Sequence, residues 1–150
     1  MVGQTKKLPG HLKPGHYVLH NNMSNNDLID ILRGGRQTPV NVTFNNVTDI
    51  YQLAGKIGKQ IEADSVSIIH LLSDSAYLAS MGKTHQTAAS LFIPNTCEFY
   101  WNSTANEFIS RMFQESKRFW NKKRKQKASE IGLSPEQVII LASIVEKETN

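Results

Sequence analysis

The spacing of apolar residues along the chain predicts both strands and helices. Residues 40–44 alternate between apolar and polar, so Val42 and Phe44 share one face of a predicted strand. Residues 16–19, HYVL, follow a Pro-Gly turn signal and predict a short strand, and the aromatic residues 99–101 predict another. Helical spacing dominates elsewhere, which predicts a chain of mixed secondary structure.

The predicted helices begin and end at polar and glycine signals. Ser24 is the N-cap of a helix with Asp27 in its first turn, and Gly34 and Gly35 stop it. The further helical segments are residues 49–62 after Thr48 as N-cap, residues 65–81 as one or two short helices closed by Gly82, and a long helix that begins near Thr104.

The last helix has the strongest start signal. Ser134 stands at the N-cap and Pro135 at the first helical position, and Gln137 can complete a capping box with the serine. The run that follows is apolar nearly all round, which predicts a buried helix. The side chains expected in the core are Val138, Leu141, Ala142 and Val145.

Glu146 follows this apolar run directly. Burial would disfavour its charged form and raise its pKa toward the range useful to a general acid. Glu148 lies about 200° further round the helix, so the two carboxylates cannot face one substrate atom. Ser143 could donate a hydrogen bond to Glu146. From the pattern alone, a solvated helix end is the more common explanation of such a sequence.

The composition fits one ordinary domain or two very small ones with a packed core. Of the 150 residues, 39% are hydrophobic and 20% are charged, which excludes a disordered or low-complexity chain. No apolar run approaches the roughly 18 to 20 residues that a membrane helix needs. Cys97 is the single cysteine, so the chain has no internal disulfide and no CxxC motif.

The net charge of +4 comes from one segment, residues 117–127, which holds seven of the 17 basic residues and no acidic one. Such a run can bind the phosphates of a nucleic acid, and aromatic residues within it could stack on the bases. A solvated helix face is the favoured interpretation, so no nucleic-acid partner is expected. The apolar residues that would form the opposite, core-facing stripe are Phe108, Met112, Phe119 and Trp120.

The histidines do not predict a metal site. His11, His16 and His20 have no cysteine or carboxylate within their stretch to complete a zinc set. The glycine-rich pieces RGGR and LAGKIGK likewise lack the spacing of a phosphate-binding loop.

The string LASIVEKET, residues 141–149, resembles the signature of the YceG-like family of endolytic peptidoglycan transglycosylases at all nine positions. Upstream, LKPGHYVL followed by MSNNDLIDILRGGRQTPV is similar to the family's small LysM-like module, and LFIPNTCEFYW resembles its Pro-Asp/Asn-Thr strand. Two positions depart from the pattern. Cys97 stands where the family usually has an aromatic residue, and Asn45-Asn46-Val47 replaces an acidic-glycine turn.

The resemblance implies that Glu146, the first glutamate of EKET, is the catalytic acid/base. The implied reaction is nonhydrolytic cleavage of the β-1,4 bond between N-acetylmuramic acid and N-acetylglucosamine within a glycan strand. It leaves 1,6-anhydro ends and terminates glycan elongation. The resemblance implies no metal and no cofactor.

The resemblance also implies an α+β fold and an organisation in parts. We expect residues 1–7 to be a tail or cloning remnant and residues 8–45 a LysM-like module of strand, helix and strand. Residues 46–150 would be the first part of a truncated, helix-rich catalytic domain with short strands. Family members have a cytoplasmic tail and one membrane helix, and they continue past EKET. We therefore expect a single-pass protein of the bacterial inner membrane that faces the periplasm, with its anchor outside this chain.

The expected partners are peptidoglycan glycan strands, with peptidoglycan synthases as further candidates. One alternative is a noncatalytic peptidoglycan-binding fragment that acts through the LysM-like module. Another is a nucleic-acid binder that uses residues 117–127. Salt-sensitive binding of DNA by a protein that ignores peptidoglycan would favour the latter.

Overall fold

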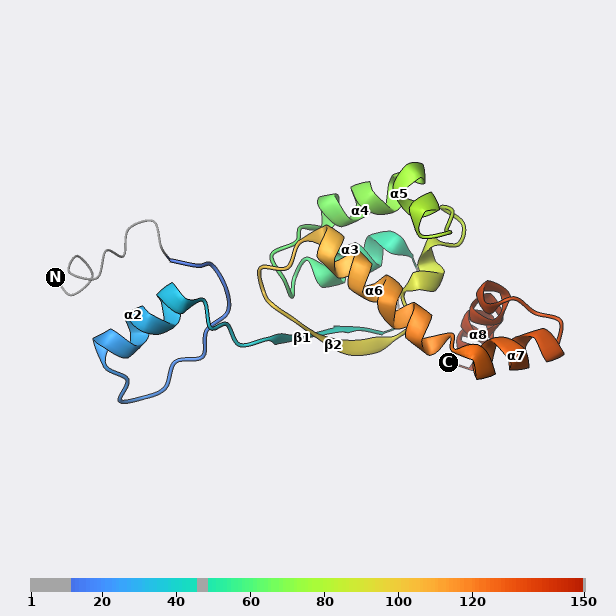
Figure 1. Ribbon diagram of the computed structural model, residues 1–150. Helices are drawn as coiled ribbons and strands as arrows, with labels where there is room; N and C mark the ends of the chain where they lie inside the picture. Colours follow the sequence, from blue (N-terminus) through green and yellow to red (C-terminus); the bar gives the residue numbers. More distant parts are fainter. Residues whose placement is uncertain (1–11, 46–48, 150) are drawn as a thin grey trace.

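The protein is described by a computed structural model that covers residues 12–45 and 49–149. Seven α-helices, one 3-10 helix and a two-stranded antiparallel sheet make up this described part, which confirms the predicted α+β class (Figure 1). The elements in chain order are α2 (Asn25–Gly34), β1 (Val40–Phe44), α3 (Ile50–Ile57), α4 (Ser65–Ser73), α5 (Ser75–Ser80), the 3-10 helix η1 (Ala88–Leu91), β2 (Asn95–Phe99), α6 (Ala105–Phe119), α7 (Lys122–Glu130) and α8 (Pro135–Thr149).

The N-terminal helix α2 lies apart from the other helices (Figure 1). It begins as predicted, because the Ser24 hydroxyl accepts a hydrogen bond from the Asp27 N–H while the Asp27 carboxylate accepts one from the Ser24 N–H. Gly35, with a left-handed φ of 65°, ends the helix as the glycine signal predicted.

The strand predicted for residues 16–19 is wrong. Within the described chain this segment joins no β-ladder. It makes isolated contacts instead: the His16 carbonyl accepts from the Thr38 N–H at 2.8 Å, and His16 Nδ1 lies 3.2 Å from the Thr38 carbonyl oxygen. A run with strand-like composition therefore stays irregular where no neighbouring strand is placed to pair with it.

The strands β1 and β2 pair antiparallel, with Val40 opposite Phe99 at one end. This confirms the strand predicted at residues 40–44. The strand predicted for residues 99–101 is displaced, because β2 ends where its partner β1 begins. Tyr100 and Trp101 lie in an exposed turn. The buried face of the sheet is formed by Val42, Phe44, Cys97 and Phe99.

Helix α3 is shorter than predicted. Its N-cap is Asp49, whose carboxylate accepts a backbone hydrogen bond at 2.8 Å, while the predicted cap Thr48 lies outside the described residues. The helix ends at Ile57 and does not continue to residue 62, because turns follow Gly58. The short helices predicted before Gly82 are α4 and α5, and Gly82 has a left-handed φ of 67°.

The long basic helix predicted after Thr104 is two helices. Thr104 caps α6 and forms a capping box with Glu107, as its position indicated. The helix ends at Phe119, however, and Asn121 caps a new helix, α7, by accepting a hydrogen bond from the Arg124 N–H at 3.0 Å.

The core lies between the buried face of the sheet and the helices α3 to α6, which gather on one side of it (Figure 1). Phe108 of α6 is fully buried at the centre of this core. Its ring contacts those of Phe44, Phe92 and Phe99, with centroids 6.2, 6.0 and 5.4 Å away. Apolar contacts between β1, β2, α6 and the segment after η1 therefore form the centre of the core.

Candidate functional site

The helices α7 and α8 form a bent pair at the C-terminal end of the described chain (Figure 1). Their axes differ by 74° across a break in which Gly132 has a left-handed φ of 71°. The predicted start of the last helix is confirmed: Ser134 and Gln137 exchange hydrogen bonds of 3.2 and 2.7 Å. No single helix among the described residues has the length and apolarity to cross a membrane, and α7 with α8 passes that test only as a bent pair.

The predicted burial of α8 is wrong. No residue of this helix is buried: Val138 is half-buried, and Leu141, Ala142 and Val145 are exposed. The apolar run is present, but burial needs a partner surface, and α8 packs along one side only, against α7 and η1. Glu146 is exposed as well, so the burial expected for this side chain is absent.

A groove of about 590 Å³ runs between α8, the junction of α6 and α7, and the segment around η1. Its lining is mostly apolar and includes Phe44, Phe92, Trp120, Ile131 and Ile139. The polar side chains that reach it include Gln86, Thr87, Arg124, Lys127 and Glu146. An apolar groove with a few convergent polar groups is the usual form of a ligand site.

Glu146 lines this groove and Glu148 does not. At 100° per residue, Glu146 lies within about 40° of Ile139 and Ala142, which also line the groove, whereas Glu148 lies about 200° away from Glu146. The helix thus presents one of its two terminal glutamates to the groove. Ser143 is in the lining too, but its hydroxyl donates to the Ile140 carbonyl at 2.7 Å and not to Glu146 as expected.

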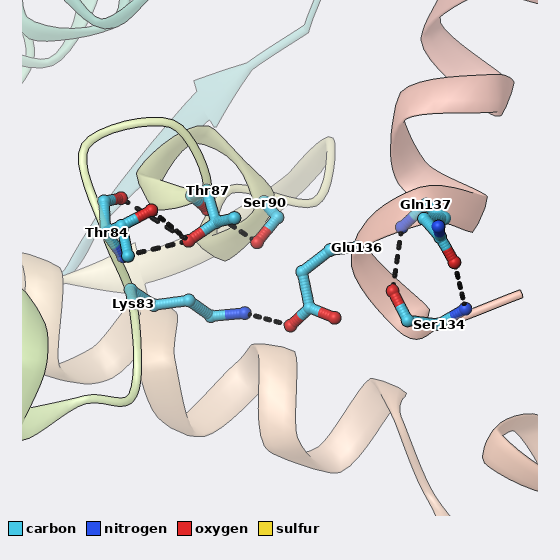
Figure 2. A network of polar contacts seen from close by, with 7 residues as sticks. All are labelled: Lys83, Thr84, Thr87, Ser90, Ser134, Glu136 and Gln137. Carbon is cyan, nitrogen blue, oxygen red and sulfur yellow. Dashed lines mark hydrogen bonds and ion pairs between the residues drawn. The ribbon is translucent and has the colours of Figure 1, made fainter.

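Lys83 and Glu136 join the turn after α5 to the first turn of α8 (Figure 2). Lys83 Nζ lies 2.6 Å from Glu136 Oε1, beside a hydroxyl network formed by Thr84, Thr87 and Ser90. The Lys83 hydrogen bond, followed by a backbone hydrogen bond, holds the pKa of Glu136 below its ordinary value. No local sequence pattern predicts this pair, because its members lie 53 residues apart along the chain.

The basic residues of α7 are all exposed, which agrees with the predicted solvated face. Two of them nevertheless line the groove: Arg124 and Lys127. Their position in the groove was not predicted from the sequence. The signal that could have found it is their spacing of three residues on a helix whose Ala128 and Ile131 face the same way.

The described residues hold no group of three His, Cys, Asp or Glu side chains that could bind a metal ion. Of the three histidines in the N-terminal pattern, His11 lies outside the described residues. His16 contacts Thr38, and the His20 N–H lies 3.2 Å from the Met23 sulfur.

Comparison with protein families gives one finding. The chain matches the family model described as the YceG-like family over residues 1–150. No curated protein and no solved structure matches it. The matched range includes the whole groove and Glu146.

Proposed function

Because the chain belongs to the YceG-like family, we propose that it is part of a lytic transglycosylase that cuts peptidoglycan glycan strands, with Glu146 as the acid/base. The observation that carries this proposal is the position of Glu146 in the lining of the large groove, on the side of α8 that Glu148 does not share. The substrate bond is the β-1,4 bond between N-acetylmuramic acid and N-acetylglucosamine.

One carboxyl group suffices for both proton transfers. The neutral Glu146 carboxyl donates its proton to the glycosidic oxygen as the bond between this oxygen and the muramic acid C1 breaks. The carboxylate that results then takes the proton of the C6 hydroxyl of the same sugar while O6 bonds to C1. The products are a 1,6-anhydro end and a free C4 hydroxyl, and Glu146 regains its proton without any consumption of water.

The groove supplies surfaces suited to a sugar strand. Trp120 offers a large, flat apolar surface, and Gln86 and Thr87 offer hydrogen-bonding groups to hydroxyl and amide substituents. A strand seated there would also cover the exposed Glu146 and exclude water from the reacting atoms.

The location and partners follow from the same proposal. The protein would act at the periplasmic face of the bacterial inner membrane, beside peptidoglycan synthases. Residues 8–45 would form the LysM-like module and help to hold the glycan. A noncatalytic peptidoglycan-binding role is the competing possibility.

The test compares Glu146→Gln with Glu148→Gln in the full-length protein. Glutamine keeps the shape of the side chain but cannot deliver a proton, so Glu146→Gln should lower the rate at least about 10⁴-fold. Glu148→Gln should have little effect. Mass spectrometry of digested glycan strands measures the 1,6-anhydro ends. Substantial anhydro product from Glu146→Gln, or its loss in a folded Glu148→Gln variant, would overturn the assignment, and glycan binding without any anhydro product from the wild type would favour the noncatalytic role.

A further inference from the structure

Two basic side chains of α7 face the same groove as Glu146. Arg124 and Lys127 line it, and the neighbouring Lys122, Lys123 and Lys125 do not. The two lining residues are three positions apart, which places them about 60° apart round the helix. The apolar Ala128 and Ile131 lie on the same face and also line the groove. The basic segment is therefore divided into an inward pair and an outward set.

Arg124 is held in position by contacts with its own helix junction. Its Nη1 donates to the Phe119 carbonyl at 2.8 Å, and its guanidinium carbon lies 4.1 Å from the centroid of the Phe119 ring. A guanidinium has five N–H donors, and this hydrogen bond uses one of them. A fixed planar cation with further donors is suited to binding a carboxylate through two parallel hydrogen bonds.

Neither Arg124 nor Lys127 forms an ion pair with a carboxylate of the described residues. Glu136 is already bonded to Lys83 at 2.6 Å. The Lys127 side chain makes no hydrogen bond or ion pair with another described residue. Lys127 is exposed and lines the groove, so its side chain is accessible to an anionic ligand seated there.

We propose that Arg124 and Lys127 bind a carboxylate carried by the glycan strand and so determine specificity for acidic strands. This inference rests on the proposed function. Two parts of the substrate can supply this group. The lactyl ether of a peptide-free muramic acid ends in a carboxylate, and peptide-bearing strands carry the carboxylates of their peptides. A neutral polymer of N-acetylglucosamine has neither.

The test measures binding in the Glu146→Gln background of the full-length protein, so that no turnover occurs. The probes are N-acetylglucosamine oligomers, peptide-free glycan strands and peptide-bearing glycan strands. Arg124→Gln with Lys127→Gln should raise Kd about tenfold or more for at least one acidic probe and leave the neutral oligomer unchanged. The strand that loses affinity identifies the source of the carboxylate, and added salt should reduce the difference between the variants.

The matched control is Lys122→Gln with Lys125→Gln, which removes the same charge from the same helix outside the groove. This control should leave all three affinities within about twofold, as expected for exposed charges. Equal losses in the two double variants would show a general charge effect and overturn the proposal. Unchanged affinity for both acidic strands in the Arg124→Gln with Lys127→Gln variant would also overturn the proposal.

Two further variants keep the result interpretable. Arg124→Gln also removes the contact with Phe119, so Lys127→Gln alone, which breaks no side-chain hydrogen bond or ion pair with a described residue, should show part of the loss. Arg124→Lys keeps the charge and should recover part of the affinity. Cleavage by the Glu146→Gln protein would contradict the proposed function. If the Glu146→Gln protein is inactive but binds acidic strands equally well after Arg124 and Lys127 are replaced, only this inference is contradicted.

Discussion

Lys83 and Glu136 form an ion pair, 2.6 Å between Nζ and Oε1, that fastens the base of α8 to the turn after α5. The side chains are 13% and 33% exposed, so the pair is more shielded from water than an ordinary surface pair. Because α8 buries none of its own residues, this contact at its first turn has an unusually large share in fixing the helix.

Replacing Lys83 with Met should therefore loosen α8 selectively. We expect faster hydrogen exchange in the amides of α8, with those of α3 and α4 unchanged, because the core does not depend on the pair. The swapped variant Lys83→Glu with Glu136→Lys should restore part of the protection. Arg118→Met, which breaks an exposed pair with Glu115, is the control and should leave α8 unaffected. Unchanged exchange in α8 after Lys83→Met would contradict the prediction.

The same pair predicts a dependence on pH. The pKa of Glu136 is lowered in the folded protein by the Lys83 hydrogen bond, so its contribution to stability is complete above the ordinary glutamate pKa of about 4.3 and is lost as the pH falls through the lower folded value. Glu136→Gln should remove this component. Thermal unfolding and α8 exchange, compared for wild type and variant from pH 7 to about pH 3, should differ at neutral pH and converge in acid. A difference that grew in acid would have the wrong sign.

Phe108→Ala should be among the most destabilising substitutions in the core. It removes a fully buried ring that contacts three other aromatic rings and leaves a cavity. A loss of about 3 to 5 kcal/mol in the free energy of unfolding is expected, as measured by urea denaturation. Tyr100→Ala, at a ring that is 55% exposed, should cost much less. Similar losses for the two variants would show that the core is centred elsewhere.

The Cys97 thiol should react slowly with a disulfide reagent in the folded protein. Burial, followed by the negative charge of Glu115, raises the pKa of this thiol and so lowers its thiolate fraction. Labelling should become fast in denaturant. A Cys97→Ser protein with Glu98→Cys, whose new thiol lies on the exposed face of β2, should label rapidly without denaturant. Rapid labelling of native Cys97 would show that β2 opens readily.

Helix starts could be predicted from the sequence because each depends on residues a few positions apart. The Ser24 and Asp27 pair and the Ser134 and Gln137 pair encode their own hydrogen bonds, whatever the rest of the chain does. The break before Asn121 escaped prediction for a related reason. The residues that follow Trp120 are polar, so no regular spacing of apolar residues continues past this point. A break in the helix therefore changes no pattern that could be seen in the sequence.

Burial and the site's shape could be predicted only in part. The alternation that placed Val42 and Phe44 on the buried face was a correct guide, because a sheet face and its covering helices came from the same chain. The apolar residues of α8 are not covered in the same way. Apolarity indicates that a side chain can be buried, but it does not indicate which surface covers it. Glu136 lines the groove and pairs with Lys83, and no local pattern encodes a contact across such a separation.

Helix α8 is bent by 74° from α7 and is attached through the Lys83–Glu136 ion pair at its first turn. A change in its tilt therefore moves its C-terminal end further than its first turn. Glu146 stands ten residues beyond Glu136, or about 15 Å along the helix axis. A tilt of about 10° at the first turn would therefore carry the carboxyl through roughly 2.6 Å, close to the length of a hydrogen bond. The reach of Glu146 into the groove is thus set by an angle at the far end of the helix, where small changes in the turn around Gly132 are amplified into atomic distances.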